Sequence, residues 1–386
     1  MSADKFRQQA EQGDATAQYN LAVVYYLGED GDQDWAQAVY WYAKAAEQGH
    51  RNAQFNLGLM YHQGKGISLD EAAAAYWYMQ ASEQGHINAL FNLGLMYQQG
   101  TGVPQDLAKA AALYLKAAEA GHVYAAFNLA LLYHQGRGVH QSYADAIDWY
   151  KRAAEAGHVT SQFNLALLYH QGKGVQRDKP QAAHLYKLAS EQGHAVATFN
   201  LAMMLHQGDG VRANAEEAAF LYHRVAKTGH ATAQFMLASM YEVGEGVKQS
   251  HEEAARWYQA AADQGHMKAQ YKLAIKCRNG EGVPKNPMLA MRLLGLAADQ
   301  GYPKALYELA QMLQTGSGVP KDPRLAADCY RRAADLGHAS SQFALATMYE
   351  QGEGVQKDEQ EAARWYSKAA QQGHTKALKN LTLMHD

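Results

Sequence analysis

One glycine recurs every 36 residues along this chain, and this strict period constrains the fold more than any other feature. The glycine stands at Gly13, Gly49, Gly85, Gly121, Gly157, Gly193, Gly229, Gly265, Gly301, Gly337 and Gly373. Eight residues later there is a leucine in all eleven copies, from Leu21 to Leu381. An uninterrupted period of this length indicates a repeat protein, in which each unit is stabilised by contacts with its neighbours.

Each repeat is predicted to be a pair of helices. We number positions within a repeat from the glycine, which is position 0. Ala53, Leu57 and Met60 (positions 4, 8 and 11) have helical spacing and predict a first helix, helix A, which ends at Gly64 (position 15). The sequence GxGV from position 15 predicts a turn, and the run EAAAAYWYMQASEQ (residues 71–84) predicts a second helix, helix B. A hairpin of this size cannot bury its own apolar faces, so neighbouring repeats must cover them.

The period also divides the chain. We expect an N-terminal capping helix at residues 1–12, ten repeats at 13–372 and a C-terminal capping half-repeat at 373–386. The 48% of hydrophobic residues is ample for a buried core. The two cysteines, Cys277 and Cys329, occupy packing positions, so we expect free thiols and no disulfide.

These residues match a known family. The sequence GHRNAQFNLGLMYHQGKGI (residues 49–67) followed by AAAAYWYMQASEQG (72–85) resembles the Sel-one-like repeat, a 36-residue relative of the tetratricopeptide repeat, and the resemblance covers virtually the whole chain. It implies an all-α fold, a right-handed α/α superhelical solenoid of 36-residue helix-turn-helix repeats. It also implies an adaptor or scaffold in protein complexes, commonly bacterial, without naming a partner.

Charge and hydropathy limit the classes of partner that this chain can bind. A net charge of −3 indicates neither nucleic acid nor an anionic membrane surface. No apolar run approaches the roughly 18 residues of a membrane helix, and the N-terminus does not resemble a signal peptide. We therefore expect a cytoplasmic protein that binds a protein or peptide, without membrane insertion; the oligomeric state stays open, a monomer included.

Two recurring patterns look chemical, but we expect no cofactor. GxGV lacks the third glycine of a dinucleotide-binding loop and follows a helix, so a helix stop and turn is the better interpretation. Nine histidines stand at position 1, from His50 to His374. Equivalent residues of stacked repeats lie roughly 10 Å apart, too far to share a metal ion. We interpret these histidines as loop packing and as positive charge near a helix C-terminus.

No grouping of Ser, His and Asp, of Cys and His, or of paired carboxylates points to catalysis, so we expect no enzymatic activity. An enzyme with a site assembled across repeats is the disfavoured alternative, and it would need an acidic pair within about 5–10 Å in a cleft.

Positions 3, 7, 10 and 14 fall on the side of helix A opposite its packing residues. Helix A lines the concave surface in solenoids of this kind, so this side is the candidate groove. Its members in the first six repeats are uniform: Asn20, Asn56, Asn92, Asn128, Asn164 and Asn200 at position 7; Leu59, Leu95, Leu131 and Leu167 at position 10; His62, His134, His170 and His206 at position 13; and Gln63, Gln135 and Gln171 at position 14. After repeat six, position 7 changes to Met236, Lys272, Glu308 and Ala344.

The asparagines allow two interpretations. A carboxamide can both donate to and accept from the backbone of an extended peptide, and six of them about 10 Å apart would hold on the order of 15 residues. Alternatively, each bonds a neighbouring helix and is part of the architecture. For the charged residues of the later repeats, such as Lys268, Lys376 and Glu242, a solvated face and partner specificity are both open.

The function that we expect is a non-enzymatic adaptor or scaffold that binds an extended peptide or partner protein in its groove. The alternative is a bacterial immunity or regulatory protein that sequesters one folded partner, such as a toxin. That alternative predicts tight, stoichiometric binding to a single folded protein.

Overall fold

The computed structural model describes residues 3–29 and 31–385, which form α-helices joined by turns and contain no strand. The helices are α1 (Ala3–Glu11), α2 (Ala15–Leu27), α3 (Trp35–Glu47), α4 (Arg51–Gln63), α5 (Glu71–Glu83), α6 (Ile87–Gln99), α7 (Leu107–Glu119), α8 (Val123–Gln135), α9 (Tyr143–Glu155), α10 (Val159–Gln171), α11 (Lys179–Glu191), α12 (Ala195–Gln207), α13 (Ala215–Ala226), α14 (Ala231–Val243), α15 (His251–Asp263), α16 (Met267–Asn279), α17 (Pro287–Asp299), α18 (Pro303–Thr315), α19 (Pro323–Asp335), α20 (Ala339–Gln351), α21 (Glu359–Gln371) and α22 (Thr375–His385). The all-α fold with two helices per 36 residues is confirmed.

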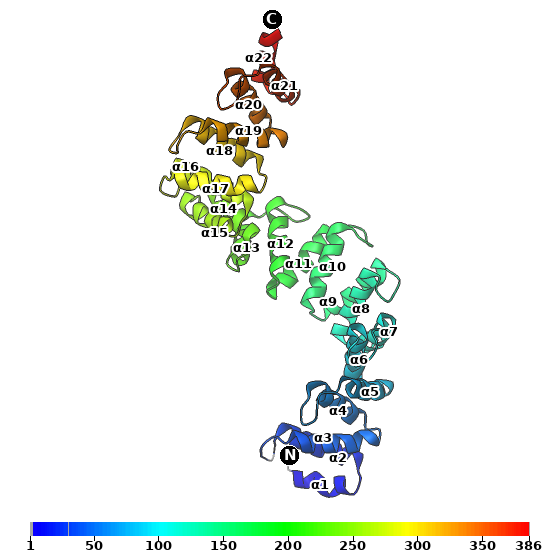
Figure 1. Cartoon of the computed structure of the whole chain (residues 1–386). Helices are drawn as coiled ribbons and strands as arrows, with labels where there is room; N and C mark the ends of the chain where they lie inside the picture. Colours follow the sequence, from blue (N-terminus) through cyan, green and yellow to red (C-terminus); the bar gives the residue numbers. More distant parts are fainter. Residues whose placement is uncertain (1–2, 30, 386) are drawn as a thin grey trace. The chain divides into compact units, whose positions relative to one another are not determined.

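The chain forms two compact units, residues 1–197 and 198–386, and the division falls within α12. Inside each unit a helix packs against the helices that precede and follow it in the sequence, as Figure 1 shows. Even-numbered helices from α2 onward are the predicted helices A, and odd-numbered helices from α3 onward are the predicted helices B. Each unit is therefore a stack of helical hairpins, built from contacts between neighbours.

Helix A begins at the histidine of position 1. In His86 the ring Nδ1 accepts a hydrogen bond from the backbone N–H of Ala89 at 3.2 Å, which satisfies one of the free N–H groups of the helix start. Asp14 does the same in the first repeat, accepting from Ala17 at 2.6 Å. An imidazole that accepts at Nδ1 must be neutral, and burial lowers the pKa of His86. The predicted role near a helix C-terminus is therefore wrong, because the histidine caps the N-terminus of the next helix.

The two glycines of the GxGV sequence have different tasks. The first, for example Gly64, adopts the left-handed conformation at φ +62° and ends helix A. The second, for example Gly102 at φ +69°, lies so close to the first residue of the preceding helix B that a Cβ atom would overlap the carbonyl oxygen of Glu71. The predicted turn is therefore also a contact between repeats. Glycine is required at its first position by the left-handed backbone, and at its second position by the close approach of the neighbouring helix as well.

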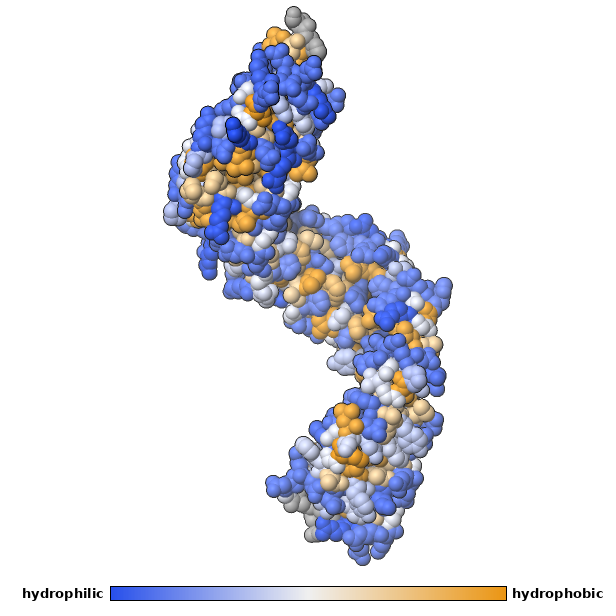
Figure 2. All heavy atoms as spheres, in the orientation of Figure 1, coloured by the Kyte–Doolittle hydropathy of each residue, from blue (hydrophilic) through white to orange (hydrophobic). Residues whose placement is uncertain are grey.

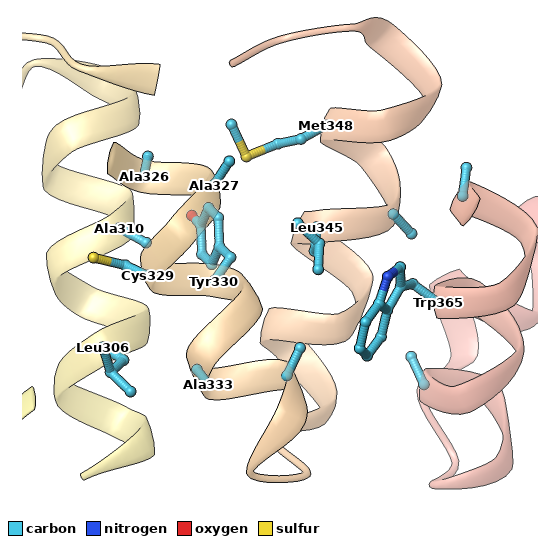
Figure 3. Packing of buried hydrophobic residues seen from close by; sticks show 14 of the residues in the cluster. Leu306, Ala310, Ala326, Ala327, Cys329, Tyr330, Ala333, Leu345, Met348 and Trp365 are labelled. Carbon is cyan, nitrogen blue, oxygen red and sulfur yellow. The ribbon is translucent and has the colours of Figure 1, made fainter. Parts of the chain in front are cut away.

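The core of each unit is built from alanines and, in nine of the ten repeats, one buried tyrosine; the eighth repeat has Leu294 at that position. Small alanines let the helices approach closely, and a tyrosine at position 29 of helix B fills the space between them. Figure 3 shows Tyr330 of α19 between Ala310 of α18 and Leu345 of α20; only 2% of this tyrosine is exposed. Burial of such a ring stabilises the stack by about 2–3 kcal/mol. Cys277 and Cys329 are buried free thiols, as predicted.

A pair of hydrogen-bonded glutamines links the two helices of many repeats. The buried glutamine at position 5 donates to a carbonyl at the end of the preceding helix B and accepts from a glutamine at position 35. The pairs are Gln18–Gln48, Gln54–Gln84, Gln162–Gln192, Gln234–Gln264, Gln270–Gln300 and Gln342–Gln372. In the remaining four repeats neither position carries glutamine: the residues are Leu90 and Ala120, Ala126 and Ala156, Thr198 and Thr228, and Leu306 and Leu336. The two positions therefore change together.

Candidate partner-binding surface

We call positions 7, 10, 13 and 14 of helix A the helix-A stripe. All of the predicted site residues on it keep contact with solvent, whereas positions 4, 8 and 11 of the same helices are buried or nearly so. Partly buried members are Asn20, Asn56, Asn92, Asn128, Asn164, Asn200, Leu59, Leu95, Leu131, Leu167, His134, His170 and His206; the exposed members are His62, Gln63, Gln135 and Gln171. The first five asparagines lie in the first unit, and Asn200 lies in the second.

Two asparagines at position 7 bond the buried tyrosine of the preceding repeat, whereas the Tyr78 hydroxyl, in the repeat before Asn92, has no hydrogen-bond partner within the described chain. Asn164 donates from Nδ2 to the hydroxyl of Tyr150 at 3.3 Å, and Asn380 donates to Tyr366 at 3.0 Å. Burial raises the pKa of Tyr150 to about 12, and the hydrogen bond from Asn164 opposes part of that rise. Each of these asparagines therefore has an architectural contact through its nitrogen. The structure gives the Asn164 carbonyl oxygen no hydrogen bond within the described chain.

Position 13 approaches the same hydroxyl from the other side. His134 Nδ1 lies 3.4 Å from the Tyr150 oxygen, so His134 and Asn164, from successive helices A, converge on one group. In the next repeat back, the Tyr114 hydroxyl donates to Gln98 Oε1 at 2.7 Å. Other histidines pair with carboxylates instead: His62 with Glu71 at 2.7 Å and His206 with Glu245 at 3.3 Å. The predicted asparagine and histidine positions are thus brought together, whereas Gln63, Gln135 and Gln171 extend into solvent where helix A ends.

Sequence reasoning missed the aromatic residue at position 6, beside each asparagine. Its ring lies against the capping histidine of the following repeat: Phe55 stacks on His86 with centroids 4.3 Å apart, and Phe91 on His122 at 4.4 Å. The available signal was that position 6 is Phe or Tyr in all ten repeats, from Tyr19 to Phe343. These partly buried rings supply an apolar wall beside the polar stripe.

A hollow of about 410 Å³ lies at the N-terminal ends of helices A in the first unit. It crosses three successive repeats and is lined by Asn52, His86, Asn88 and His122 together with Arg51. Because it follows the stacking direction, it suits a chain that lies across several repeats. Figure 2 shows how apolar side chains reach the surface in patches between hydrophilic ones.

In the second unit the stripe is mixed, and its charged members in repeats seven to nine pair with each other. Arg278 at position 13 pairs with Glu308 at position 7 of the next repeat. Glu242 likewise accepts from Lys272 at 2.9 Å and from the Tyr258 hydroxyl at 2.9 Å. Although burial raises the pKa of Glu242, its bonds to Lys272, Lys276 and Tyr258 hold it below the usual value. These pairs link neighbouring helices A, while Lys272 and Arg278 stay partly exposed to solvent.

Lys276 is an exception in the core. It is 1% exposed and stands at position 11, where the other nine repeats carry methionine, leucine or valine. Its Nζ lies 3.0 Å from Glu242 Oε1 and 3.9 Å from Glu281 Oε2. A buried ammonium requires such partners because the loss of hydration costs several kcal/mol per ion.

Across residues 3–29 and 31–385, no cluster of three or more His, Cys, Asp or Glu side chains has the spacing of a metal site. None of the helices in that part of the chain is long and apolar enough to span a bilayer.

Comparison with known proteins places this repeat in a family. The sequence model of the Sel1 repeat matches ten successive segments, residues 15–50, 51–86, 87–122, 123–158, 159–194, 195–230, 231–266, 268–302, 303–338 and 339–374. The chain belongs to the Sel1 repeat family. This confirms the resemblance that the sequence suggested. Proteins built from Sel1 repeats generally serve as scaffolds for protein interactions.

Solved structures agree with the Sel1 repeat fold. The protective antigen c5321 of uropathogenic Escherichia coli is 35% identical, with a TM-score of 0.86 over 99% of this chain and 82% of that chain. A Sel1 repeat protein from Oxalobacter formigenes is 30% identical, with a TM-score of 0.65 over 85% of this chain and 93% of that chain. The immunity protein Pa5087 of Pseudomonas aeruginosa is 21% identical over 55% of this chain and 81% of its own; its TM-score of 0.33 is too low to bear on function. No curated protein matches the chain.

Proposed function

We propose that the first unit is a protein-interaction module whose helix-A stripe binds an extended segment of a partner protein. The observation that carries this proposal is that the asparagine is dispensable for packing but is retained in every repeat of the unit. Tyr330 stays buried although Ala344 replaces asparagine opposite it, and its hydroxyl donates to Gln314 Oε1 at 3.1 Å, the same kind of bond that Tyr114 makes to Gln98. A tyrosine of this fold therefore does not need the asparagine, and contact with a partner accounts for its retention.

The chemistry of the stripe suits a peptide backbone. The side-chain nitrogen of Asn164 donates to the Tyr150 hydroxyl, and its carbonyl oxygen remains able to accept a hydrogen bond from a peptide N–H. The half-buried leucines at position 10 and the aromatic rings at position 6 supply apolar contacts on either side. With repeats about 10 Å apart and about 3.3 Å per extended residue, every third peptide N–H would meet one asparagine.

The test separates recognition from architecture with two sets of variants. The first carries Asn56→Ala, Asn92→Ala, Asn128→Ala and Asn164→Ala. The second carries Tyr42→Phe, Tyr78→Phe, Tyr114→Phe and Tyr150→Phe, which removes the hydroxyls and leaves the asparagines in place. Proteins captured by the native chain are identified by mass spectrometry, and synthetic peptides from them are titrated against each variant.

We expect the asparagine variant to lose peptide binding and the tyrosine variant to keep it. If both variants lose thermal stability but their folded fractions still bind the peptide with the native affinity, the asparagines only support the packing. If the chain binds the folded partner but none of the peptides derived from it, the result would favour the alternative function, in which the protein sequesters one folded partner.

A further inference from the structure

The second unit has a hollow of its own on the helix-A stripe. It measures about 430 Å³ and lies between α18, α20 and α22. Gln311, Gln314 and Tyr330 contribute polar groups to it, and Thr347, Thr375 and Lys376 complete the lining together with the rings of Phe343 and His374. The lining therefore combines hydrogen-bonding groups with aromatic walls.

The hollow exists where the asparagine of position 7 is replaced by Ala344. In the following half-repeat Asn380 reaches the Tyr366 hydroxyl, and in the fifth repeat Asn164 reaches Tyr150. Ala344 ends at its Cβ atom, so the volume that the carboxamide occupies elsewhere is open here, above the hydroxyl of Tyr330. We call this space the Ala344 hollow.

The free hydroxyl and ammonium groups of the Ala344 hollow can all donate hydrogen bonds, and the hydroxyls can also accept them. Ser340, Thr375 and Lys376 have no side-chain hydrogen bond or ion pair within the described chain. His374 accepts at Nδ1 from the Ala377 N–H, so its proton is on Nε2. Lys376 is the charged residue among those that line the hollow, and its side chain is exposed.

The carboxylates of α18 and α20 have other partners, and Lys376 forms no ion pair within the described chain. Glu350 accepts from the Tyr366 hydroxyl at 2.6 Å. Glu353 accepts from Gln314 at 2.9 Å and pairs with Lys321 at 3.1 Å. Glu308 pairs with Arg278. The field at the mouth of the Ala344 hollow is consequently that of an unpaired ammonium surrounded by hydroxyl and imidazole donors, which is complementary to an anion.

We propose that the Ala344 hollow is an anchor site for an acidic side chain, aspartate or glutamate, of a partner protein. The carboxylate bonds Lys376 and the hydroxyl donors, and the methylene groups pack on Phe343 and Tyr307. This inference rests on the proposed function, because it assumes that helix-A surfaces bind segments of a partner protein. It concerns the second unit and a different set of residues.

The experiment uses the purified full chain and two capped amino acids, N-acetyl-glutamate N-methylamide and its glutamine analogue. Methyl NMR follows Ala344, Thr347 and Thr375, with Thr160 of the first unit as a distant reference. We expect a saturable shift of the three nearby methyls with the glutamate compound, with an affinity up to roughly fivefold higher than that of the glutamine compound, which is the upper end for an exposed ion pair. Added salt should reduce the difference.

Two variants make the test specific. Ala344→Asn restores the residue found at this position in six other repeats, so it should fold, fill the hollow and abolish the shift. Lys376→Met keeps the length of an exposed side chain and should remove the preference for glutamate over glutamine. Equal shifts with both compounds, no shift at all, or full binding by Ala344→Asn would overturn the proposal. The asparagine variants of the first unit leave this hollow intact, so the two proposals fail independently.

Discussion

Gln84 donates its side-chain amide to Oε1 of Gln54 at 2.8 Å, and Gln54 in turn donates to the carbonyl oxygen of Ala46. This relay joins three successive helices, α3, α4 and the end of α5. Gln54 is only 4% exposed, so its polar atoms cannot rely on water when a partner is lost. Leu90 and Ala120 occupy the equivalent positions in the next repeat. The fold therefore also accepts an apolar pair in place of the two glutamines.

A double-mutant cycle on this pair should show strong coupling. We expect Gln54→Leu and Gln84→Ala each to lower the free energy of unfolding by about 1 kcal/mol, because the first removes the bonds to Ala46 and Gln84 and the second leaves the buried Gln54 Oε1 without its donor. The double variant, which reproduces the Leu90 and Ala120 combination, should cost less than the sum of the two. Urea titrations measure all four chains, and strictly additive losses would contradict the coupling.

The close approach at the GxGV turn predicts that Gly102→Ala is more damaging than Gly121→Ala. Both glycines have positive φ, +69° and +89°, but only Gly102 has a neighbour at the place of the missing Cβ. We expect a loss of about 1 kcal/mol for Gly121→Ala and at least about 2 kcal/mol for Gly102→Ala. Thermal melts followed by circular dichroism compare them, and equal losses would mean that backbone conformation alone selects glycine.

The histidine caps predict a loss of stability in mild acid. Burial lowers the pKa of His50, His86, His122 and His158 in the folded chain below the ordinary value of 6.5. The unfolded chain therefore binds protons first, so the stabilisation is complete above pH 6.5 and declines as the pH falls toward the lower folded-state pKa.

Replacement of these four histidines by asparagine tests the caps. Asparagine can accept the same N–H but does not titrate. We expect the variant to be less stable at pH 7, because it lacks the rings that stack on Phe55 and its equivalents, but to lose less stability between pH 7 and pH 5. Urea unfolding of the native chain and the variant at pH 7 and at pH 5 provides the measurement. If both chains lose the same free energy of unfolding between these pH values, other groups cause the acid sensitivity.

The buried ion pair predicts an asymmetry between its two members. Lys276→Met introduces the residue found at this position in most repeats and leaves Glu242 paired with Lys272 and Tyr258, so stability should be unchanged or higher. Glu242→Gln leaves the ammonium of Lys276 buried without its main partner and should cost about 3–5 kcal/mol. Denaturant titrations of both variants check the sign, and a larger loss from Lys276→Met would refute this account.

The fold was predictable because its signal is periodic and local. Leu57 and its equivalents mark helix A, and Gly64 marks its end, without any knowledge of tertiary structure. The partners of the polar groups were not predictable in this way. That His86 caps a helix start, or that Asn164 and His134 share one tyrosine hydroxyl, depends on how successive helices A are aligned, which the period alone does not specify. The link between Gln54 and Gln84 was visible as joint variation, but only a structure shows that the two positions touch.

The placement of these contacts affects how such a chain can gain or lose repeats by recombination. Gln54 and Gln84 belong to one repeat, so a duplication that begins and ends at the period copies both partners together. Glu242 and Lys276 belong to successive repeats, the seventh and the eighth. Deletion of the seventh repeat alone would place His206 of the sixth where Glu242 now stands, and Lys276 would lose its main carboxylate. We therefore expect these two repeats to be gained or lost as one 72-residue block, whereas a glutamine pair by itself does not tie the side chains of one repeat to those of the next.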